Sequence, residues 1–535
     1  MKKRALLVGT ILLGLCVTAC DSFLSPFVFD SGSNEENTSL SSSEESTYSS
    51  SESQSESSSE EESSSTSDSS GGSSSSSSEY IEPKYVSFEV YPFNDVHGNV
   101  IDTPGEGISL SKTATALKEM TQGKYSVFVS QGDMWQGSVE SNYTKGNIVT
   151  EWMNSLGFVS MTVGNHEFDW GEEPVKDNAQ LADFPMLGIN VMKRATNTRV
   201  DYLEASTTFM RGDAKIGVIG AIGNCYSSIS SSKVKDIYFE TGNDLTDLVM
   251  EESNRLRNEE NCDFIIYSIH GSASRDDADS YDIELSSGHY VDLVLEGHTH
   301  DAYAELDSAG VYHVQCDSRN SNTYQIIVSL DINNHLVQVE KPIFKDLSYA
   351  NSLYNDYPED SATEEILAKY HDSYAFAYDP IGTVGSRKNS TVLKSKVADL
   401  YLEAGLKKWG DDYDIIVGGG YMSCREPGYL AAGTVNYAQL AVLFPFDNSI
   451  VLCSIMGYNL RNSYFIKYNS NYYLTWTEYG EQAKETIYNY DTYYLITDTY
   501  SSDYANNHLT VIDTLEEGVY ARDLLKDYIA AGNWA

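Results

Sequence analysis

The chain of 535 residues has 35 basic and 79 acidic side chains, which gives a formal net charge of −44. This length exceeds that of one ordinary domain, and a hydrophobic content of 41% is sufficient to build folded cores. The acidity argues against a protein that binds nucleic acid through a basic surface, so no nucleic-acid partner is predicted.

The first twenty residues have the features of a targeting segment. Lys2, Lys3 and Arg4 precede an apolar run over residues 5–17. This order is typical of a secretory signal peptide, which we predict over residues 1–20. The segment ends in Val17-Thr18-Ala19-Cys20, which resembles a bacterial lipobox, whose Cys becomes a lipidated N-terminus. We therefore expect a protein on the extracellular face of the bacterial cell membrane, anchored by a lipid on Cys20. An ordinary signal peptide with a chance Cys is the alternative.

Residues 21–84 are predicted to form a disordered tether. They are rich in Ser and Glu, and residues 21–82 contain 14 of the 79 acids and no Lys or Arg. Such a composition cannot bury enough apolar surface to fold, and like charges extend the chain. Most of the acidity therefore belongs to the remainder of the protein.

The cysteines indicate no complete disulfide framework. Besides Cys16 and Cys20 in the signal segment, the chain contains Cys225, Cys262, Cys316, Cys424 and Cys453. Their odd number and the absence of a C-x-x-C pair favour buried free thiols, and one disulfide stays an open alternative.

From residue 85 onward, apolar strands alternate with helical stretches. Strands are predicted over residues 86–90, 125–129, 158–163, 263–269 and 291–295, and helices over residues 108–119 and 362–376. This alternation predicts a layered α/β core. We expect a first domain over residues 85–345, a connector helix within residues 346–378, and a second α/β domain over residues 379–535.

Polar side chains able to bind metal follow five of these strands. They are Asp95, His97, Asp133, Asn165, His166, His270, His298 and His300. Loops at strand ends are the usual place for chemistry in α/β proteins. Mixed nitrogen and oxygen donors suit Zn²⁺, Mn²⁺, Fe or Co²⁺ better than Ca²⁺. So many donors exceed the need of one tetrahedral ion and favour two divalent ions about 3.5–4 Å apart.

These motifs resemble the blocks of the calcineurin-like metallophosphoesterases. The blocks are Asp95-x-His97, Gly132-Asp133, Gly164-Asn165-His166-Glu167, His270 and Gly297-His298-x-His300. Extension of the third block to Phe168-Asp169 resembles the secreted 5′-nucleotidase family, which includes UDP-sugar hydrolases and 2′,3′-cyclic-nucleotide phosphodiesterases. The resemblance implies a four-layer α/β/β/α metallophosphoesterase domain followed by a smaller α/β C-terminal domain.

The resemblance also implies a role for each residue. Asp95, His97, Asp133 and His300 would hold one metal ion, and Asp133, Asn165, His270 and His298 the other. His166 would pair with Asp169 as a catalytic dyad, because a carboxylate three residues away can orient an imidazole and raise its pKa. The alternative for Asp169 is a carboxylate that stabilises a helix start.

The expected reaction is release of phosphate from a nucleotide. Two cations would lower the pKa of a bound water and neutralise phosphate oxygens, and hydroxide would attack phosphorus. His166 would stabilise the transition state or protonate the departing oxygen.

The C-terminal region carries weaker motifs of the same family. A Gly-rich turn at residues 417–420 and Arg425 would bind the substrate through Gly419, Gly420 and the guanidinium group. Phe446 and Tyr500 would clamp the base, and stacking of this kind contributes about 1–3 kcal/mol. The alternatives are an ordinary turn and ordinary core rings.

Departures from the family leave the exact substrate open. The arginines expected at the start of this domain have only Arg387, Lys388 and Lys394 as candidates, Val417 replaces an Asn, and residues 504–507 replace a Gly-Asp-Gly segment. 5′-Nucleoside monophosphates lead, followed by 2′,3′-cyclic nucleotides and nucleotide sugars. A catalytically silent nucleotide-binding surface protein, and a hydrolase of a non-nucleotide phosphoester or sulfur compound, are the competing hypotheses.

Overall fold

The computed structural model describes residues 81–102, 107–271, 284–285, 288–425, 427–463, 472–503 and 508–535. The predicted signal peptide, Cys20 and nearly all of the predicted tether lie outside these residues. Residues 81–535 belong to one compact unit. Among the described helices, none combines the length and the apolar character needed to cross a membrane.

Two mixed sheets form the core of the first half. The first has the order β17-β16-β1-β2-β3-β4, and β18 also pairs with β16. Its strands are β1 (Tyr85–Phe93), β2 (Ser126–Ser130), β3 (Ser160–Thr162), β4 (Met186–Leu187), β16 (Asn322–Asp331), β17 (Leu336–Val339) and β18 (Ile343–Asp346). The second has the order β14-β15-β13-β10-β8-β7. Its strands are β7 (Ser206–Arg211), β8 (Ala214–Ile222), β10 (Phe264–His270), β13 (Leu293–Glu296), β14 (Tyr303–Leu306) and β15 (Tyr312–Gln315).

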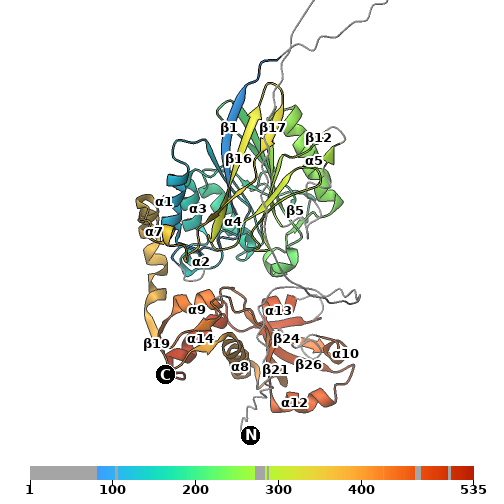
Figure 1. Cartoon of the computed structure of the whole chain (residues 1–535). Coiled ribbons are helices and arrows are strands. Elements are labelled where there is room, and N and C mark those ends of the chain that lie inside the picture. The colour runs from blue at the N-terminus through green and yellow to red at the C-terminus, as the bar shows by residue number, and fades with distance from the viewer. Residues whose placement is uncertain are drawn as a thin grey trace, which may run out of the picture. The chain divides into compact units, whose positions relative to one another are not determined.

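Helices cover the outer faces of both sheets. The helices α1 (Leu110–Met120), α3 (Asn147–Leu156) and α4 (Glu172–Leu181) lie on one side, and α5 (Asn243–Asn258) lies on the other (Figure 1). Alternate residues of each strand separate the layers. Val90 of β1 and Ile266 of β10 pack between the sheets, whereas Tyr91 and Ile265 face the helical layers. The predicted four-layer α/β/β/α architecture is therefore confirmed.

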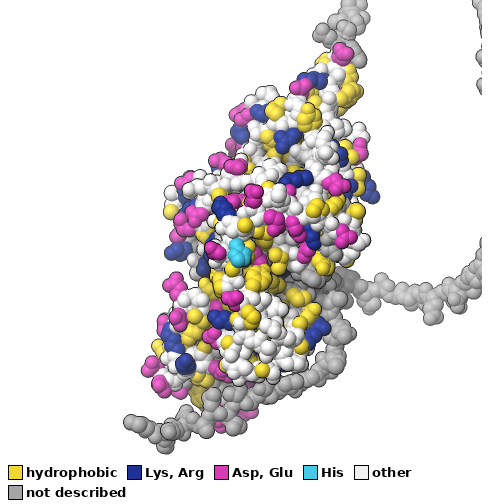
Figure 2. All heavy atoms as spheres, turned by 90° about the vertical axis from the view of Figure 1, so that its left-hand side faces the viewer, with side chains coloured by type: hydrophobic (Ala, Val, Ile, Leu, Met, Phe, Trp, Pro, Cys, Tyr) yellow, Lys and Arg dark blue, Asp and Glu magenta, His cyan; other side chains and the backbone are white. Residues whose placement is uncertain are grey.

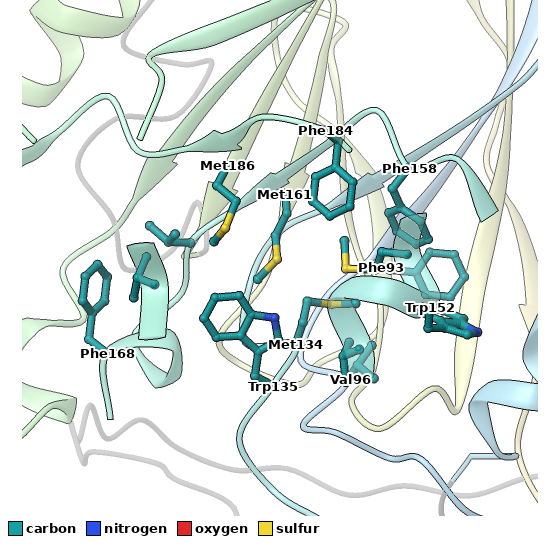
Figure 3. Packing of buried hydrophobic residues seen from close by; sticks show 14 of the residues in the cluster. Phe93, Val96, Met134, Trp135, Trp152, Phe158, Met161, Phe168, Phe184 and Met186 are labelled. Carbon is teal, nitrogen blue, oxygen red and sulfur yellow. The ribbon is translucent and has the colours of Figure 1, made fainter. Parts of the chain in front are cut away.

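Large buried side chains fill the space between the first sheet and its helices. Trp152 from α3 contacts Phe93 at the end of β1, and Met161 and Phe158 complete the cluster (Figure 3). Trp135, which is fully buried, belongs to the same cluster. The core thus anchors the loop that follows β2, where Asp133 lies.

The region between the two predicted domains contains α7 (Ser361–Tyr374) and η4 (Ala375–Tyr378). Apolar residues of α7, including Ile366 and Leu367, pack against the core cluster that also contains residues of α3. The hydroxyl of Tyr370 donates a hydrogen bond of 2.6 Å to Glu151. The predicted helix over residues 362–376 corresponds to α7, and its last two residues belong to η4.

A second sheet-and-helix assembly forms the C-terminal region. Its five-stranded sheet has the order β25-β21-β26-β24-β27. The strands are β21 (Ile415–Tyr421), β24 (Ile450–Met456), β25 (Tyr472–Trp476), β26 (Thr492–Asp498) and β27 (Thr510–Thr514). The helices are α8 (Ser390–Trp409), α9 (Tyr437–Leu443), α10 (Gly457–Leu460), α12 (Glu478–Glu485), α13 (Thr499–Asp503) and α14 (Ala521–Ala530). Two apolar clusters lie on the two faces of this sheet, so the second predicted α/β core is present.

The remaining elements are short. They are α2 (Val139–Tyr143), η1 (His166–Phe168), β5 (Val191–Lys193), β6 (Thr198–Arg199), η2 (Tyr226–Ser228), η3 (Ser231–Lys233), β9 (Ile237–Phe239), β11 (Glu284–Leu285), β12 (Gly288–His289), α6 (Ser352–Asn355), β19 (Pro380–Val384), β20 (Lys388–Asn389), β22 (Tyr429–Leu430) and β23 (Gly433–Asn436).

The predicted Gly-rich turn at residues 417–420 is wrong. Gly418, Gly419 and Gly420 lie inside β21 and pair with β25. A Cβ at Gly419 would lie 2.0 Å from the carbonyl oxygen of Tyr473, and one at Gly420 would lie 2.5 Å from Ser501 Oγ. These glycines are required by close packing within the sheet.

Charged side chains of both signs are interspersed on the face that Figure 2 shows. On this face the acidic side chains do not form one continuous patch. The five cysteines outside the signal segment are free thiols, and all except Cys424 are buried. The single disulfide left open above is absent from the described residues.

Candidate metal centre

The candidate ligands converge because parallel strands end at the same edge of each sheet. β1, β2 and β3 are parallel neighbours, and so are β8, β10 and β13. The first set of strands is followed by Asp95, His97, Asp133 and Asn165, and the second ends in or is followed by His270, His298 and His300. The centre therefore lies between the carboxyl ends of the two sheets.

Asp95, His97 and His300 form one group of donors. The Nε2 atoms of His97 and His300 are 3.1 Å apart. Asp95 Oδ1 lies 3.2 Å from Nε2 of His300 and 3.8 Å from Nε2 of His97. Asp95 and His97 are almost completely buried, and His300 is partly exposed. The group thus points its donors at one small volume.

Asp133, Asn165 and His270 form the adjacent group. Nε2 of His270 lies 3.1 Å from Asn165 Oδ1 and 3.3 Å from Asp133 Oδ2. Ring centroids of His298 and His270 are 5.3 Å apart. Asp95, Asp133 and His270 also lie close enough to one another to share an ion, so the two groups are contiguous.

Backbone carbonyl groups orient two of the imidazole rings. Nδ1 of His97 lies 3.0 Å from the carbonyl oxygen of Gln136, and Nδ1 of His270 lies 2.7 Å from that of Gln131. A carbonyl only accepts, so Nδ1 carries the proton in each ring, and Nε2 is left for the centre. Outer hydrogen bonds of this kind fix the tautomer of metal-binding histidines.

The electrostatics of the centre favour metal binding. Burial and the neighbouring His300 lower the pKa of His97, and burial and His270 lower that of His298 to about 4. Both rings are therefore neutral, which is the form that binds metal. Burial lowers the pKa of His270, but Asp133 outweighs this effect and raises the pKa to about 10.

The donor set fits the binding of divalent metal. Asp95 Oδ1 is buried and has no well-aligned hydrogen-bond donor among the described residues. Nε2 of His97 and Nε2 of His300 face each other, as do acceptor atoms of Asn165 and His270. Buried acceptors that face acceptors are costly unless a proton or cation lies between them.

Several candidate ligands have backbone conformations that are rare for residues with a side chain. Asp95, His97, Asp133, His298 and His300 have φ values between 49° and 76°. Left-handed conformations cost about 1–3 kcal/mol each and cluster at functional sites, where the surrounding structure enforces them. The loops are therefore shaped to direct side chains at the centre.

The structure also brings the predicted dyad together. Nδ1 of His166 lies 2.8 Å from Asp169 Oδ2, and the backbone N–H of His166 donates to Asp133 Oδ1 over 2.8 Å. Burial lowers the pKa of His166, but the carboxylates of Asp169 and Asp133 outweigh it and raise the pKa. Nε2 of His166 lies 3.9 Å from Asp133 Oδ2, so the ring borders the centre.

Glu167 was part of a motif, but its role could not be predicted from the sequence. Its carboxylate accepts backbone N–H groups of Asp133 (2.8 Å), Gly164 (2.7 Å), Met134 (2.9 Å) and Trp135 (3.4 Å). Burial raises the pKa of Glu167 to about 7, and these donors oppose the rise by stabilising the carboxylate. Glu167 thus ties the loop after β2 to the loop after β3.

The predicted substrate-binding residues make contacts with the metal centre and with one another. The Phe446 ring stacks on the His166 ring with centroids 5.7 Å apart, and Cζ of Arg425 lies 5.3 Å from the Phe446 centroid. Tyr500 instead contacts Tyr421, with centroids 5.9 Å apart. Gly419 and Gly420 lie within β21, and residues 504–507 lie outside the described residues.

A second arginine, Arg319, has its backbone near the centre and was not predicted from the sequence. The backbone N–H of Arg319 donates to the carbonyl oxygen of Asp95 over 2.8 Å. Burial and the charge of Arg319 lower the pKa of Arg425, whereas Asp133 and Asp169 oppose this decrease. Arg387 lies elsewhere, 3.6 Å from the centroid of the Tyr429 ring. The segment around Arg319 has no motif that could have identified it.

Comparison with known proteins identifies the first domain. The calcineurin-like phosphoesterase family matches residues 90–302. An apyrase from Tabanus yao is 25% identical over 386 residues, which cover 66% of this chain and 66% of the relative. The UshA protein of Escherichia coli K12 is 24% identical over 425 residues, which cover 71% of this chain and 76% of the relative.

A solved structure agrees with this relationship at the level of the fold. A putative 5′-nucleotidase from Staphylococcus aureus superposes with a TM-score of 0.63 at 16% identity, and the match covers 83% of this chain and 97% of that one. Calcineurin-like phosphoesterases are hydrolases that use divalent metals. Residues 90–302 therefore match the calcineurin-like phosphoesterase family, and the relatives of the chain include an apyrase, UshA proteins and 5′-nucleotidases.

Proposed function

We propose that this protein is an extracellular, metal-dependent phosphohydrolase that releases phosphate from nucleotides. The observation that carries the proposal is the convergence of Asp95, His97, Asp133, Asn165, His270, His298 and His300 between the ends of two sheets. The names of its 5′-nucleotidase homologues state a nucleotide substrate, which supports the substrate class.

Two divalent ions held by these residues would supply an activated water and neutralise the charge on phosphate oxygens. Asp133 lies between the donor groups, so its carboxylate is the proposed bridge. Asp169 orients His166 and favours its protonated form. His166 therefore donates a hydrogen bond to the transferring phosphoryl group or a proton to the departing ribose oxygen.

The phosphate is held by guanidinium groups as well. Arg425 was predicted for this role, and Arg319 approaches the centre through its backbone bond to Asp95. Charge-assisted bonds from arginine match the geometry of phosphate oxygens. With their positive charge near the metal donors, these arginines would let an anionic substrate approach an otherwise acidic protein.

Phe446 and Tyr500 remain the proposed binding residues for the base. Phe446 already lies against His166, so a nucleotide whose phosphate reaches the metal donors would bring its base near this ring. Tyr500 supplies the second aromatic face of the proposed clamp.

The proposed location rests on the N-terminal sequence alone. A lipid on Cys20 would hold the enzyme at the outer face of the membrane, and residues 21–84 would act as its tether. A Cys20→Ala variant should then leave the membrane fraction for the medium, which immunoblotting of the fractions would measure.

The activity is tested with the full chain in detergent, stripped of metal and reloaded with Mn²⁺, Zn²⁺ or Co²⁺. Phosphate release is measured from AMP, 2′,3′-cyclic AMP, UDP-glucose and an aryl phosphate. We expect metal-dependent release from AMP that falls at least a hundredfold in His166→Ala, because general acid catalysis contributes about 10²–10⁴-fold.

The matched control is His371→Ala, since His371 is an exposed histidine on α7. It should retain full activity. Release from UDP-glucose or the cyclic nucleotide alone would replace the 5′-nucleotidase proposal by that activity. Two bound metals without release from any substrate would favour the silent binding protein.

A further inference from the structure

Cys225 lies at the edge of the metal centre, although the sequence suggested only a buried free thiol. It follows the end of β8, which is the parallel neighbour of β10, and Ile222 pairs with His270 in the register. The backbone N–H of Gly223 donates to the carbonyl oxygen of His270 over 2.9 Å. Like the other donors, Cys225 therefore follows a parallel strand and lies at the same edge of the sheet.

The thiol of Cys225 lies among metal-binding groups. Its Sγ, one ring nitrogen of His270 and one of His298 all lie within 4.8 Å of one another. Sγ is 3.5 Å from the carbonyl oxygen of His270, a long and weak hydrogen bond. Cys225 is only 1% exposed, and His270 is completely buried.

The other buried cysteines have different surroundings. Cys225, Cys262 and Cys453 all belong to apolar clusters, but no group of metal donors in the described residues includes Cys262 or Cys453. Buried cysteines are usually small apolar side chains. Cys225 departs from that norm because both of its imidazole partners are already candidate ligands.

We propose that the sulfur of Cys225 is a ligand of the second metal ion, together with His270 and His298. The inference rests on the metal centre of the proposed function. When the ion binds, the thiol proton leaves to solvent and a metal–sulfur bond forms, with no change of oxidation state. Cys and His are both typical protein donors of zinc sites.

A sulfur ligand determines which ion the second site prefers. Thiolates are soft donors that favour Zn²⁺ over Mn²⁺, whereas carboxylate and amide oxygens suit Mn²⁺. The second site should therefore select Zn²⁺, and the group of Asp95, His97 and His300 should be less selective. The same ligand makes the centre sensitive to oxidants that modify thiolates.

The test is spectroscopic and independent of turnover. The full chain is loaded with Zn²⁺ to saturation, and X-ray absorption at the zinc edge is measured. We expect a sulfur shell at about 2.3 Å, with an occupancy near one half per zinc when two ions are bound. In the Co²⁺-loaded protein the same bond should give a sulfur-to-cobalt charge-transfer band in the near ultraviolet.

Cys225→Ser should abolish the sulfur shell and the band. Cys262 is a buried cysteine distant from the donors, so Cys262→Ser should retain both. Zn²⁺ affinity of the second site should fall at least about tenfold in Cys225→Ser, since even loss of an outer partner costs about 10–100-fold. Mn²⁺ affinity should change much less.

Two ions bound by the wild-type chain without any sulfur shell would overturn the inference and leave the proposed function standing, even if the serine variant fails to fold. A shell that persists in Cys225→Ser would also overturn it. A sulfur shell in a protein that releases no phosphate would support the inference and contradict the proposed function. A chain that binds no divalent ion would overturn both.

Discussion

Glu167 connects two loops of the metal centre through one buried carboxylate. Both of its oxygens accept backbone N–H groups, from Gly164 on one loop and from Asp133, Met134 and Trp135 on the other. Such charge-assisted bonds are about twice as strong as neutral ones. Glu167 acts on the centre by positioning Asp133 and Asn165.

Replacement of Glu167 by Gln should therefore weaken both folding and metal binding. The amide nitrogen would face an N–H donor, and one or more buried N–H groups would lose their acceptor, which costs about 1–3 kcal/mol. Denaturant unfolding and competition with a chelator would measure the two effects. The exposed Glu173→Gln on α4 is the matched control, and equal metal affinity in both variants would contradict this positioning role.

Gly164 leaves room for the carboxylate of Asp133. A Cβ at this position would lie 2.2 Å from Asp133 Oδ1 and 2.6 Å from the Asp133 nitrogen. We expect Gly164→Ala to displace Asp133 and to lower metal affinity at least tenfold, as measured by titration with Zn²⁺. Gly123→Ala is the control, because Gly123 has a φ of +74° and open space around it. That variant should lose only stability, about 1 kcal/mol.

Residues at this scale differ in how far the sequence could reveal them. The ligand types and their positions after apolar strands were sufficient to predict the donors of the centre. The left-handed conformations of Asp95, His97 and Asp133 could not be predicted, because nothing in those residue types requires them. Cys225 follows β8 in the same way, but a lone thiol after a strand is far more often an inert core residue.

At the scale of elements, the apolar runs predicted strands and layers well. Val90 and Tyr91 face opposite layers, and this period of two is visible in the sequence. Gly418–Gly420 were predicted as a turn and form part of β21 instead. Three glycines favour a turn locally, but here the close approach of α8, β25 and α13 excludes any side chain. That tertiary requirement is invisible in the sequence.

The end of β26 contains a buried carboxyl group that should make stability depend on pH. Burial raises the pKa of Asp498 to about 6, although Ser501 N–H donates to it over 2.7 Å and Tyr401 contacts it. The folded state therefore holds this proton more tightly than the unfolded state. The contribution of Asp498 to stability is largest below about pH 4 and is lost as the pH rises through about 6.

An Asp498→Asn variant should remove this loss. Relative to the wild type, its free energy of unfolding should increase by up to about 3 kcal/mol between pH 4 and pH 7.5, since one pKa unit corresponds to about 1.4 kcal/mol. Denaturant unfolding of both proteins at each pH measures the difference. The exposed Asp411→Asn should show no such trend, and a parallel pH dependence of Asp498→Asn and wild type would contradict the prediction.

At the scale of the whole molecule, Arg319 and Phe446 are the proposed contacts to the phosphate and to the base, respectively. Arg319 follows β15, and Phe446 precedes β24. Arg319→Ala should raise KM for AMP and for an aryl phosphate alike, about tenfold or more, because a charge-assisted bond contributes about 1.5–3 kcal/mol. The exposed Arg461→Ala should leave both values unchanged.

Phe446→Ala should raise KM for AMP by about 5–100-fold and change aryl phosphate hydrolysis much less, as loss of base stacking costs about 1–3 kcal/mol. Steady-state kinetics with both substrates test the two variants together. The exposed Phe344→Ala is the aromatic control. Unchanged nucleotide turnover in Phe446→Ala would eliminate the aromatic clamp.

The pairing of β16 with β1 sets the order in which the centre can be built during synthesis. β1 is synthesised first, but its antiparallel neighbour β16 follows only at residues 322–331. By then every strand of the second sheet has been synthesised, β14 and β15 last. A nascent chain ending before β10 thus presents Asp95, Asp133 and Asn165 without their partners from the other sheet, His270, His298 and His300. Contacts so distant along the chain form slowly. Ion capture is consequently a late step of maturation, and the metal supply in the compartment where folding finishes decides which ions the protein acquires.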